Sequence, residues 1–184
     1  ETMRLIGDKW EARKVMAGAG IPILPGGKAA SVEEALETVQ RIGFPIIIKA
    51  RSGGGGKGMR LVFDEDNLPG AFAMAQREAQ ASFEDSELYL EKYIEKARHI
   101  EIQILADSQG NAIHLGERDC TIQRRYQKLL EESPSPNLGS NLRREMGQMA
   151  IKGAKVVGYL NTGTMEFLLD TQGHYYFSEM NTRI

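Results

Sequence analysis

Residues 46–63 read IIIKARSGGGGKGMRLVF: a β-branched apolar run, a loop with four consecutive glycines and a second apolar run. β-branched residues favour strands, so this stretch predicts a hairpin with strands at 46–48 and 59–63. The backbone N–H groups of consecutive glycines are unshielded and can surround an anion, and Lys49 and Lys57 add positive charge. We interpret the loop as a flap over nucleotide phosphates, although glycine runs also occur in loops that bind nothing.

The loop lacks the signatures of two common nucleotide-binding loops. No Gly-Lys-Ser or Gly-Lys-Thr follows the glycines, and the next element is a predicted strand rather than a helix. Both the Walker loop and the Rossmann turn lead into a helix, so neither describes this stretch.

The composition is that of a folded globular domain. Of the 184 residues, 41% are hydrophobic and 26% are charged, which excludes a disordered chain and a collagen-like fibre. The longest apolar runs, 46–48 and 167–169, are too short to span a bilayer. A formal net charge of -2 provides no global attraction to nucleic acid or to an anionic membrane. We therefore expect neither as a partner.

Three features bear on the origin of the chain. The single Cys120 cannot form an internal disulfide, which fits a reducing compartment. No secretory signal peptide is visible, so we expect a cytoplasmic location, or the mitochondrial matrix in a eukaryote. The chain starts at Glu1 and stops at Arg183-Ile184, from which we expect an excerpt of a longer protein.

Hydrophobic periodicity and turn signals predict a mixed order of helices and strands. We expect most strands to be antiparallel, so the predicted class is α+β. Residues 121–136 are basic, then acidic, then proline-punctuated, and are predicted to form a surface loop with a short strand. The other predicted helices are 8–19, 31–42, 67–81 and 140–157, and the other predicted strands are 88–94, 99–105, 112–115, 164–169 and 175–181.

The last two predicted strands form a hairpin around a Gln172-Gly173 turn, which places Glu166 opposite Glu179. Opposed Cβ atoms lie about 4.5–5.5 Å apart, and two carboxylates that close repel each other. A divalent cation removes the conflict, and hard oxygen ligands from two carboxylates and the amide of Asn181 suit Mg²⁺ or Mn²⁺. A slip of one residue would instead move Glu166 to the other face, leaving an ordinary solvated polar surface.

If the last strand is regular, alternate residues share the face of this acidic pair. Arg183 on that face could then bind an anionic substrate. The residues expected to line up are Tyr175, Phe177, Glu179, Asn181 and Arg183.

A dense set of cationic side chains lies between residues 118 and 128. It either forms an anion-binding wall or a surface lattice with Glu131 and Glu132, in which each ion pair adds only about 0–1 kcal/mol. We interpret Cys120 as a packing residue, and His99 on its alternating strand as either a structural residue or a ligand contact. The cationic residues are Arg118, Arg124, Arg125 and Lys128.

A series of short motifs, in order, resembles biotin carboxylase, an ATP-grasp enzyme. The resemblance extends over nearly the whole chain, and its last motif and the Glu-Arg-Asp-Cys and Gln-Arg-Arg block are specific to biotin-dependent carboxylases. The motifs are Lys49-Ala50, the glycine hairpin with Met59-Arg60, Glu91-Lys92-Tyr93, Arg98-His99-Ile100-Glu101, Glu117-Arg118-Asp119-Cys120, Gln123-Arg124-Arg125, Gln127-Lys128 and Glu179-Met180-Asn181-Thr182-Arg183-Ile184.

The resemblance implies an ATP-grasp fold with mostly antiparallel sheets and a small lid subdomain. Residues 1–23 would be the helical end of a preceding N-terminal domain, and residues 24–93 the lid with its glycine-rich hairpin. Residues 94–184 would be the first part of a truncated catalytic subdomain. Because the family continues beyond the last motif, we expect the chain alone to be unable to carboxylate biotin.

The resemblance also implies roles for individual residues. Lys128 would hold bicarbonate, and Arg183 would stabilise the reacting carboxylate. Glu166 and Glu179 would bind Mg²⁺ or Mn²⁺ with help from Asn181. Tyr126 stands where the family usually has His or Asn. The residues implied to bind nucleotide are Lys9, Lys49, Gly55, Gly56, Met59, Glu91, Lys92, Tyr93, Ile94, His99, Gln123 and Tyr126.

The implied reaction carboxylates biotin on a carrier protein or domain, using ATP and bicarbonate, through carboxyphosphate. The implied partners also include a carboxyltransferase subunit or domain and a second copy in a homodimer. The final acceptor is left open among acetyl-CoA (fatty acid biosynthesis), propionyl-CoA, methylcrotonyl-CoA, pyruvate and urea. Two alternatives remain: another ATP-grasp ligase of the carbamoyl-phosphate type, and a non-catalytic nucleotide-binding module.

Overall fold

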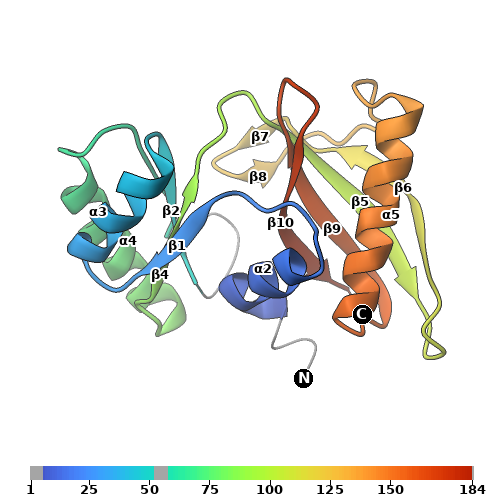
Figure 1. Cartoon of the computed structure of the whole chain (residues 1–184), viewed down its shortest axis with the longest axis horizontal. Coiled ribbons are helices and arrows are strands. Elements are labelled where there is room, and N and C mark those ends of the chain that lie inside the picture. The colour runs from blue at the N-terminus through green and yellow to red at the C-terminus, as the bar shows by residue number, and fades with distance from the viewer. Residues whose placement is uncertain (1–5, 52–57, 184) are drawn as a thin grey trace. The chain divides into compact units, whose positions relative to one another are not determined.

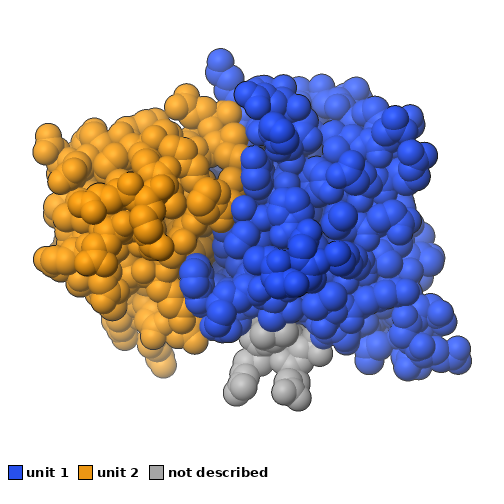
Figure 2. Space-filling model, in the orientation of Figure 1, with its two compact units in different colours: residues 1–23, 96–184 blue, residues 24–95 orange. Residues whose placement is uncertain are grey.

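The computed structural model of the chain describes residues 6–51 and 58–183. It divides into two compact units, coloured separately in Figure 2. The larger unit comprises residues 1–23 and 96–184, and the smaller unit comprises residues 24–95. The glycine loop, including Gly55 and Gly56, lies outside the described residues.

The smaller unit is a four-stranded antiparallel sheet with two helices (Figure 1). Its strands stand in the order β1-β4-β2-β3. Antiparallel pairing of β2 with β3 confirms the predicted hairpin. The elements are β1 (Gly26–Ala29), α3 (Val32–Ile42), β2 (Ile46–Ala50), β3 (Arg60–Val62), α4 (Leu68–Phe83) and β4 (Leu88–Lys92).

Local signals fix both ends of α3, close to the predicted bounds. The side chain of Ser31 accepts a hydrogen bond from the backbone N–H of Glu34 at 3.3 Å, and the carboxylate of Glu34 accepts one from the N–H of Ala30 at 2.9 Å. These contacts satisfy amide groups around the helix start that have no partner within the helix. Gly43 ends the helix with a φ of 69°, a conformation that favours glycine.

The larger unit is a four-stranded antiparallel sheet in the order β10-β9-β5-β6, with α2 and α5 packed against one face (Figure 1). Ile100, Ile102 and Ile104 point into the core between sheet and helices, so the predicted alternation along β5 is confirmed. The polar residues between them face the opposite side. The elements are α2 (Lys9–Gly18), β5 (Arg98–Ala106), β6 (Ala112–Asp119), α5 (Ser140–Val156), β9 (Asn161–Leu169) and β10 (Tyr175–Thr182).

A β-bulge sets the register of β10 against β9. Phe177 lies opposite Phe167, whereas Glu179 lies opposite Glu166, so Ser178 is an extra residue on β10. The predicted pairing of the two glutamates is therefore confirmed. Without the bulge, alternation would point Glu179 to the same side as Phe177, which is the core side.

β10 is not regular, so the condition on which its alternate residues would share one face is not met. Tyr175 and Phe177 are buried in the core, where both rings make edge-to-face contacts with Phe167. Beyond the bulge Met180 is the next core residue, so Glu179 and Asn181 face the polar side. Burial of three large apolar side chains explains why the strand breaks its period of two.

Residues 121–136 contain a short ribbon rather than a single strand, which corrects the prediction for this region. β7 (Gln123–Arg124) pairs antiparallel with β8 (Gln127–Lys128). Arg125 and Tyr126 connect them with φ values of 51° and 64°, the left-handed conformation of a tight two-residue hairpin turn. The ribbon places Gln123 directly opposite Lys128. Among the described residues, no helix is both long and apolar enough to cross a membrane.

We predict that Gly26→Ala destabilises the smaller unit. An added Cβ would lie 2.2 Å from the backbone carbonyl oxygen of Leu90 on the neighbouring strand, which cannot move without disturbing the sheet. We expect a loss of about 1–3 kcal/mol in urea unfolding followed by circular dichroism. Gly70→Ala is the control. Gly70 lies in α4, an added Cβ there would meet no neighbouring atom within 4 Å, and the substitution should stabilise the helix by up to about 1 kcal/mol. Equal stability of the two variants would contradict this account.

Candidate functional site

Three glutamates lie side by side on the polar face of the larger sheet. Glu101 of β5 is opposite Glu166 of β9, and Glu166 is opposite Glu179 of β10. Glu101 is 4% exposed and Glu166 is 1% exposed. Carboxylates this close and this buried repel each other, so the arrangement requires positive charge nearby.

Lys128 supplies that charge to two of the three acids. Its ammonium group contacts Glu101 and lies 2.6 Å from Oε1 of Glu166. Burial by itself lowers the pKa of Lys128, but the hydrogen bonds and charges of both glutamates outweigh burial and raise its pKa above the ordinary value. Lys128 is therefore a permanent cation held between two acids.

Arg118 is the second cation of the cluster. Its guanidinium contacts Glu101 and donates a hydrogen bond to Oε1 of Gln103 at 2.9 Å. Burial tends to raise the pKa of Glu101, but the contacts with Lys128 and Arg118 prevail and hold that pKa below its usual range. Glu101 therefore stays ionised, and it is a site residue that was not predicted from the sequence. Its position on the same strand face as His99 was the available signal.

Glu166 is also bound by two polar side chains. Asn181 Nδ2 donates to Glu166 Oε1 at 2.5 Å, and His99 Nε2 contacts Oε2. Gln123 Nε2 donates to His99 Nδ1 at 2.9 Å, which leaves the imidazole proton on Nε2, facing Glu166. The ribbon thus orients His99 through Gln123 and neutralises Glu166 through Lys128.

Glu179 pairs with a residue from the opposite end of the chain. Lys9 Nζ lies 3.0 Å from Oε2 of Glu179, and Lys9 is the first residue of α2. Asp8 starts that helix by accepting hydrogen bonds from two backbone N–H groups, which fixes where Lys9 emerges. The structure therefore brings Lys9, His99, Gln123, Lys128, Glu166, Glu179 and Asn181 together.

Two predicted residues of the larger unit do not join this cluster. Arg183 is exposed, and its guanidinium donates to the carbonyl of Thr182 at 3.3 Å. Tyr126 lies in the turn of the ribbon and is 44% exposed.

In the smaller unit the predicted nucleotide-binding residues make contacts of their own. Lys49 Nζ lies 2.7 Å from Oε2 of Glu91, and both side chains are at least nine-tenths buried. Lys92 Nζ donates to the carbonyl of Phe44 at 2.6 Å. The backbone N–H of Lys92 and that of Tyr93 donate to the carbonyls of Pro25 and Pro45, so these two donors are already used. Met59 and Ile94 are partly buried.

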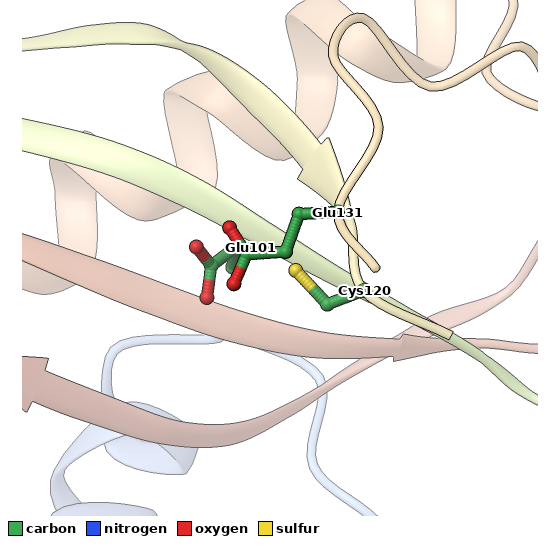
Figure 3. Close-up of side chains that lie close together, drawn as sticks. All are labelled: Glu101, Cys120 and Glu131. Carbon is green, nitrogen blue, oxygen red and sulfur yellow. The ribbon is translucent and has the colours of Figure 1, made fainter. Parts of the chain in front are cut away.

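A different trio, Glu101, Cys120 and Glu131, has ligand atoms within 4.8 Å of one another (Figure 3). Glu101 already contacts two cations, and burial together with the charge of Glu101 raises the pKa of Cys120 to about 12. A protonated thiol is a weak ligand, so this trio is the poorer cation site.

The pair of Glu166 and Glu179 fits a divalent cation better. Both acids offer hard oxygen atoms on one face of two paired strands, and the carboxamide of Asn181 lies beside Glu166. The side chain of Glu179 is 34% exposed, which leaves the pair accessible from one side. Lys9 and Lys128 flank the pair and favour the anionic groups that accompany a bound metal.

Comparison with known proteins gives a consistent result. A family profile described as the ATP-binding domain of the carbamoyl-phosphate synthase L chain matches residues 8–184. Biotin carboxylase of Nostoc sp. (strain PCC 7120) is 56% identical over 186 residues, which cover 100% of this chain and 42% of that protein. Biotin carboxylase 1 of Bacillus subtilis (strain 168) is 55% identical over 182 residues, covering 97% of this chain and 40% of that protein.

Solved structures agree. The biotin carboxylase–βγ-ATP complex from Campylobacter jejuni has a TM-score of 0.98 and 49% identity, covering 100% of this chain and 42% of that chain. The biotin carboxylase domain of the Hydrogenobacter thermophilus 2-oxoglutarate carboxylase has a TM-score of 0.96 and 48% identity, covering 99% of this chain and 41% of that chain. The chain thus spans about two fifths of the length of these relatives.

We predict that Lys128→Met destabilises the chain by about 3 kcal/mol at pH 7, because it leaves two buried carboxylates without their shared cation. Glu101 has a lowered pKa in the folded chain, so the stability that its ion pairs provide is present above its ordinary pKa of about 4.3 and is lost as the pH falls through the lowered value. The difference between wild type and variant should therefore shrink on acidification.

The measurement is urea unfolding at a series of pH values. Lys14→Met is the control, because its ion pair with Glu11 lies on an exposed helix surface and such pairs contribute at most about 1 kcal/mol. A Lys128→Met penalty that stays constant from pH 7 to pH 3 would contradict the electrostatic account.

Proposed function

Because the chain belongs to the family of the carbamoyl-phosphate synthase L chain ATP-binding domain, and because biotin carboxylases match it over its whole length, we propose that it forms the nucleotide- and metal-binding part of a biotin carboxylase. The resemblance to biotin carboxylase and the α+β ATP-grasp fold expected from the sequence are both confirmed. The activity of the whole protein is the proposal, since the relatives are more than twice as long as the chain.

The opposed pair of Glu166 and Glu179 is the observation that carries this proposal. Two carboxylates held together amid cationic side chains are arranged to share a divalent cation with phosphate oxygens. The Hydrogenobacter domain was solved with MgADP, ADP and bicarbonate, and the Campylobacter enzyme with a βγ-ATP ligand. These ligands have the chemistry that the acidic pair and its cations would accept.

In the proposed reaction an oxygen of bicarbonate attacks the γ-phosphate of ATP, giving carboxyphosphate and ADP. Carboxyphosphate then breaks down to CO2 and phosphate, and a ring nitrogen of biotin attacks the CO2 and loses its proton to the released phosphate. Glu166, Glu179 and Asn181 would hold Mg²⁺ or Mn²⁺, which when bound neutralises charge on the phosphates. Lys9 and Lys128 add positive charge on either side of the acids. Lys128 would reach bicarbonate by exchanging part of its contact with the two glutamates for the new anion.

The remaining nucleotide contacts are proposed for residues at the edges of the cluster and in the smaller unit. His99, held by Gln123, would donate a hydrogen bond from its Nε2–H to a phosphate or ribose oxygen instead of to Glu166. Lys49 would exchange its contact with Glu91 for a phosphate. The further proposed contributors are Gly55, Gly56, Met59, Glu91, Lys92, Tyr93, Ile94, Tyr126 and, for the reacting carboxylate, Arg183.

The proposed partners follow from the same reaction. A biotin carrier protein or domain presents biotin, and a carboxyltransferase subunit or domain consumes the product. A homodimer, and an acceptor such as acetyl-CoA in fatty acid biosynthesis, belong to the same proposal. The relatives include the alpha subunit of a methylcrotonoyl-CoA carboxylase and a pyruvate carboxylase, so the acceptor differs among proteins that share this segment.

The description of the family profile favours one alternative, a bicarbonate-activating ligase of the carbamoyl-phosphate type. Both classes would use bicarbonate and ATP on the same acidic pair. They differ in whether biotin or ammonia accepts the activated carbon, so dependence of ADP release on biotin separates them.

We predict that Mg²⁺ strengthens ATP binding to the wild-type chain and that Glu179→Gln weakens this Mg²⁺-dependent binding by at least about tenfold, because one charged oxygen ligand is lost. Isothermal titration calorimetry with ATP, with and without Mg²⁺, measures the effect. Glu37→Gln is the matched control, since Glu37 is an exposed residue of α3. Identical affinities for wild type and Glu179→Gln in the presence of Mg²⁺ would show that the acidic pair does not bind the metal.

The activity is tested by a chimera in which this chain replaces the matching segment of Bacillus subtilis biotin carboxylase 1, its 55% identical relative. We expect ADP release that requires both bicarbonate and biotin, and loss of that release in a Glu179→Gln chimera. A folded chimera that binds MgATP but releases ADP with ammonia and not with biotin would support the carbamoyl-phosphate alternative instead.

A further inference from the structure

Thr164 carries a buried hydroxyl group that has no partner. The residue is 3% exposed, and within the described part of the chain its Oγ1 makes no hydrogen bond. Buried polar groups are nearly always hydrogen-bonded, and an exception requires an explanation. Thr164 lies on β9, two residues from Glu166, and therefore shares the face of the acidic cluster.

The cross-strand neighbours of Thr164 are Gln103 on β5 and Asn181 on β10. Gln103 is held in place, since its Nε2 donates to Thr162 Oγ1 at 2.8 Å and to the Gly163 carbonyl at 3.0 Å. Its Oε1 accepts from Arg118. Both ends of the Gln103 carboxamide are therefore already hydrogen-bonded and are not available to Thr164.

Asn181 is in a different situation. In the described structure its side chain makes one hydrogen bond, from Nδ2 to Oε1 of Glu166 at 2.5 Å. This orientation places the NH₂ group against the carboxylate. Only the Oδ1 atom of a carboxamide can bind a hard cation, so Asn181 must turn over before it can assist Glu166 as a ligand.

Turning the carboxamide over removes Nδ2 from Glu166 and requires another acceptor for its protons. The residue directly opposite Asn181 is Thr164, and opposed Cβ atoms lie about 4.5–5.5 Å apart, within reach of an asparagine and a threonine side chain. Thr164 Oγ1, a buried acceptor without a partner among the described residues, is thus placed to accept a hydrogen bond from Nδ2 of Asn181.

We propose that Thr164 is a positioning residue for metal binding, whose hydroxyl oxygen accepts the Nδ2–H of Asn181 when Asn181 turns its Oδ1 toward a divalent cation. The hydroxyl is unpartnered in the metal-free arrangement because its partner is then bound to Glu166. This inference rests on the proposed metal site of Glu166, Glu179 and Asn181, and adds the residue that sets the orientation of the amide. Outer partners of this kind commonly change metal affinity by about 10–100-fold.

The test compares Thr164→Val, which keeps the shape but removes the hydroxyl, with Thr164→Ser, which keeps the hydroxyl. The probe is Mn²⁺ with a saturating non-hydrolysable ATP analogue, and calorimetry gives the Mn²⁺ affinity of the 184-residue chain. We expect Thr164→Val to weaken Mn²⁺ binding by about tenfold or more and Thr164→Ser to retain wild-type affinity. Thermal unfolding without metal should be unchanged or shifted upward in Thr164→Val, because an unsatisfied group is removed.

A double-mutant cycle with Asn181→Ala separates positioning from a general structural effect. If Thr164 acts through Asn181, Thr164→Val has no further effect on Mn²⁺ affinity once Asn181 is alanine. Additive losses, or wild-type affinity in Thr164→Val, would overturn the inference. If Thr164→Val does not fold, the comparison of Thr164→Ser with Thr164→Ala serves the same purpose. Failure of the wild-type chain itself to bind Mn²⁺ would count against the proposed function instead.

Discussion

The polar face of the larger unit is organised by the repulsion among three neighbouring carboxylates. Glu101 and Glu166 are almost completely buried, and burial of carboxylates is costly unless cations contact them directly. Lys128 meets both, and Arg118 adds a second cation to Glu101. The elements that carry these side chains must therefore be placed accurately for the buried acids to be neutralised.

Separate segments meet this requirement in different ways. The tight turn of the β7–β8 ribbon delivers Lys128, the first residue of α2 delivers Lys9, and the bulge at Ser178 delivers Glu179. Each device is local, but the ion pairs join residues up to 170 positions apart in the sequence. The strands of the larger sheet bury the apolar face, whereas Lys9 and Lys128, which neutralise acids on the polar face, come from segments outside that sheet.

The same arrangement suits a site for charged ligands. The acids are compensated by side chains that can exchange a glutamate for another anion, and burial strengthens each of these interactions. The side chain of Glu179 is the most exposed of the three acids and lies at the accessible side of the row. A cluster of this kind is stable without a ligand and still offers hard oxygen atoms to a cation.

The α+β class, the hairpin around the glycines and the alternation along β5 could be predicted from the sequence, because they follow from local periodicity and turn residues. The pairing of Glu166 with Glu179 was also predicted, but the register next to the turn would place Glu166 opposite Ser178, and the bulge is what makes the pair. The assembled fold places Phe177 and Glu179 on opposite sides of the sheet, adds Glu101 to the cluster and makes Lys128 a bridge between two acids. A bulge and a long-range ion pair depend on which side chains are buried together, and burial is a property of the assembled sheet rather than of any segment.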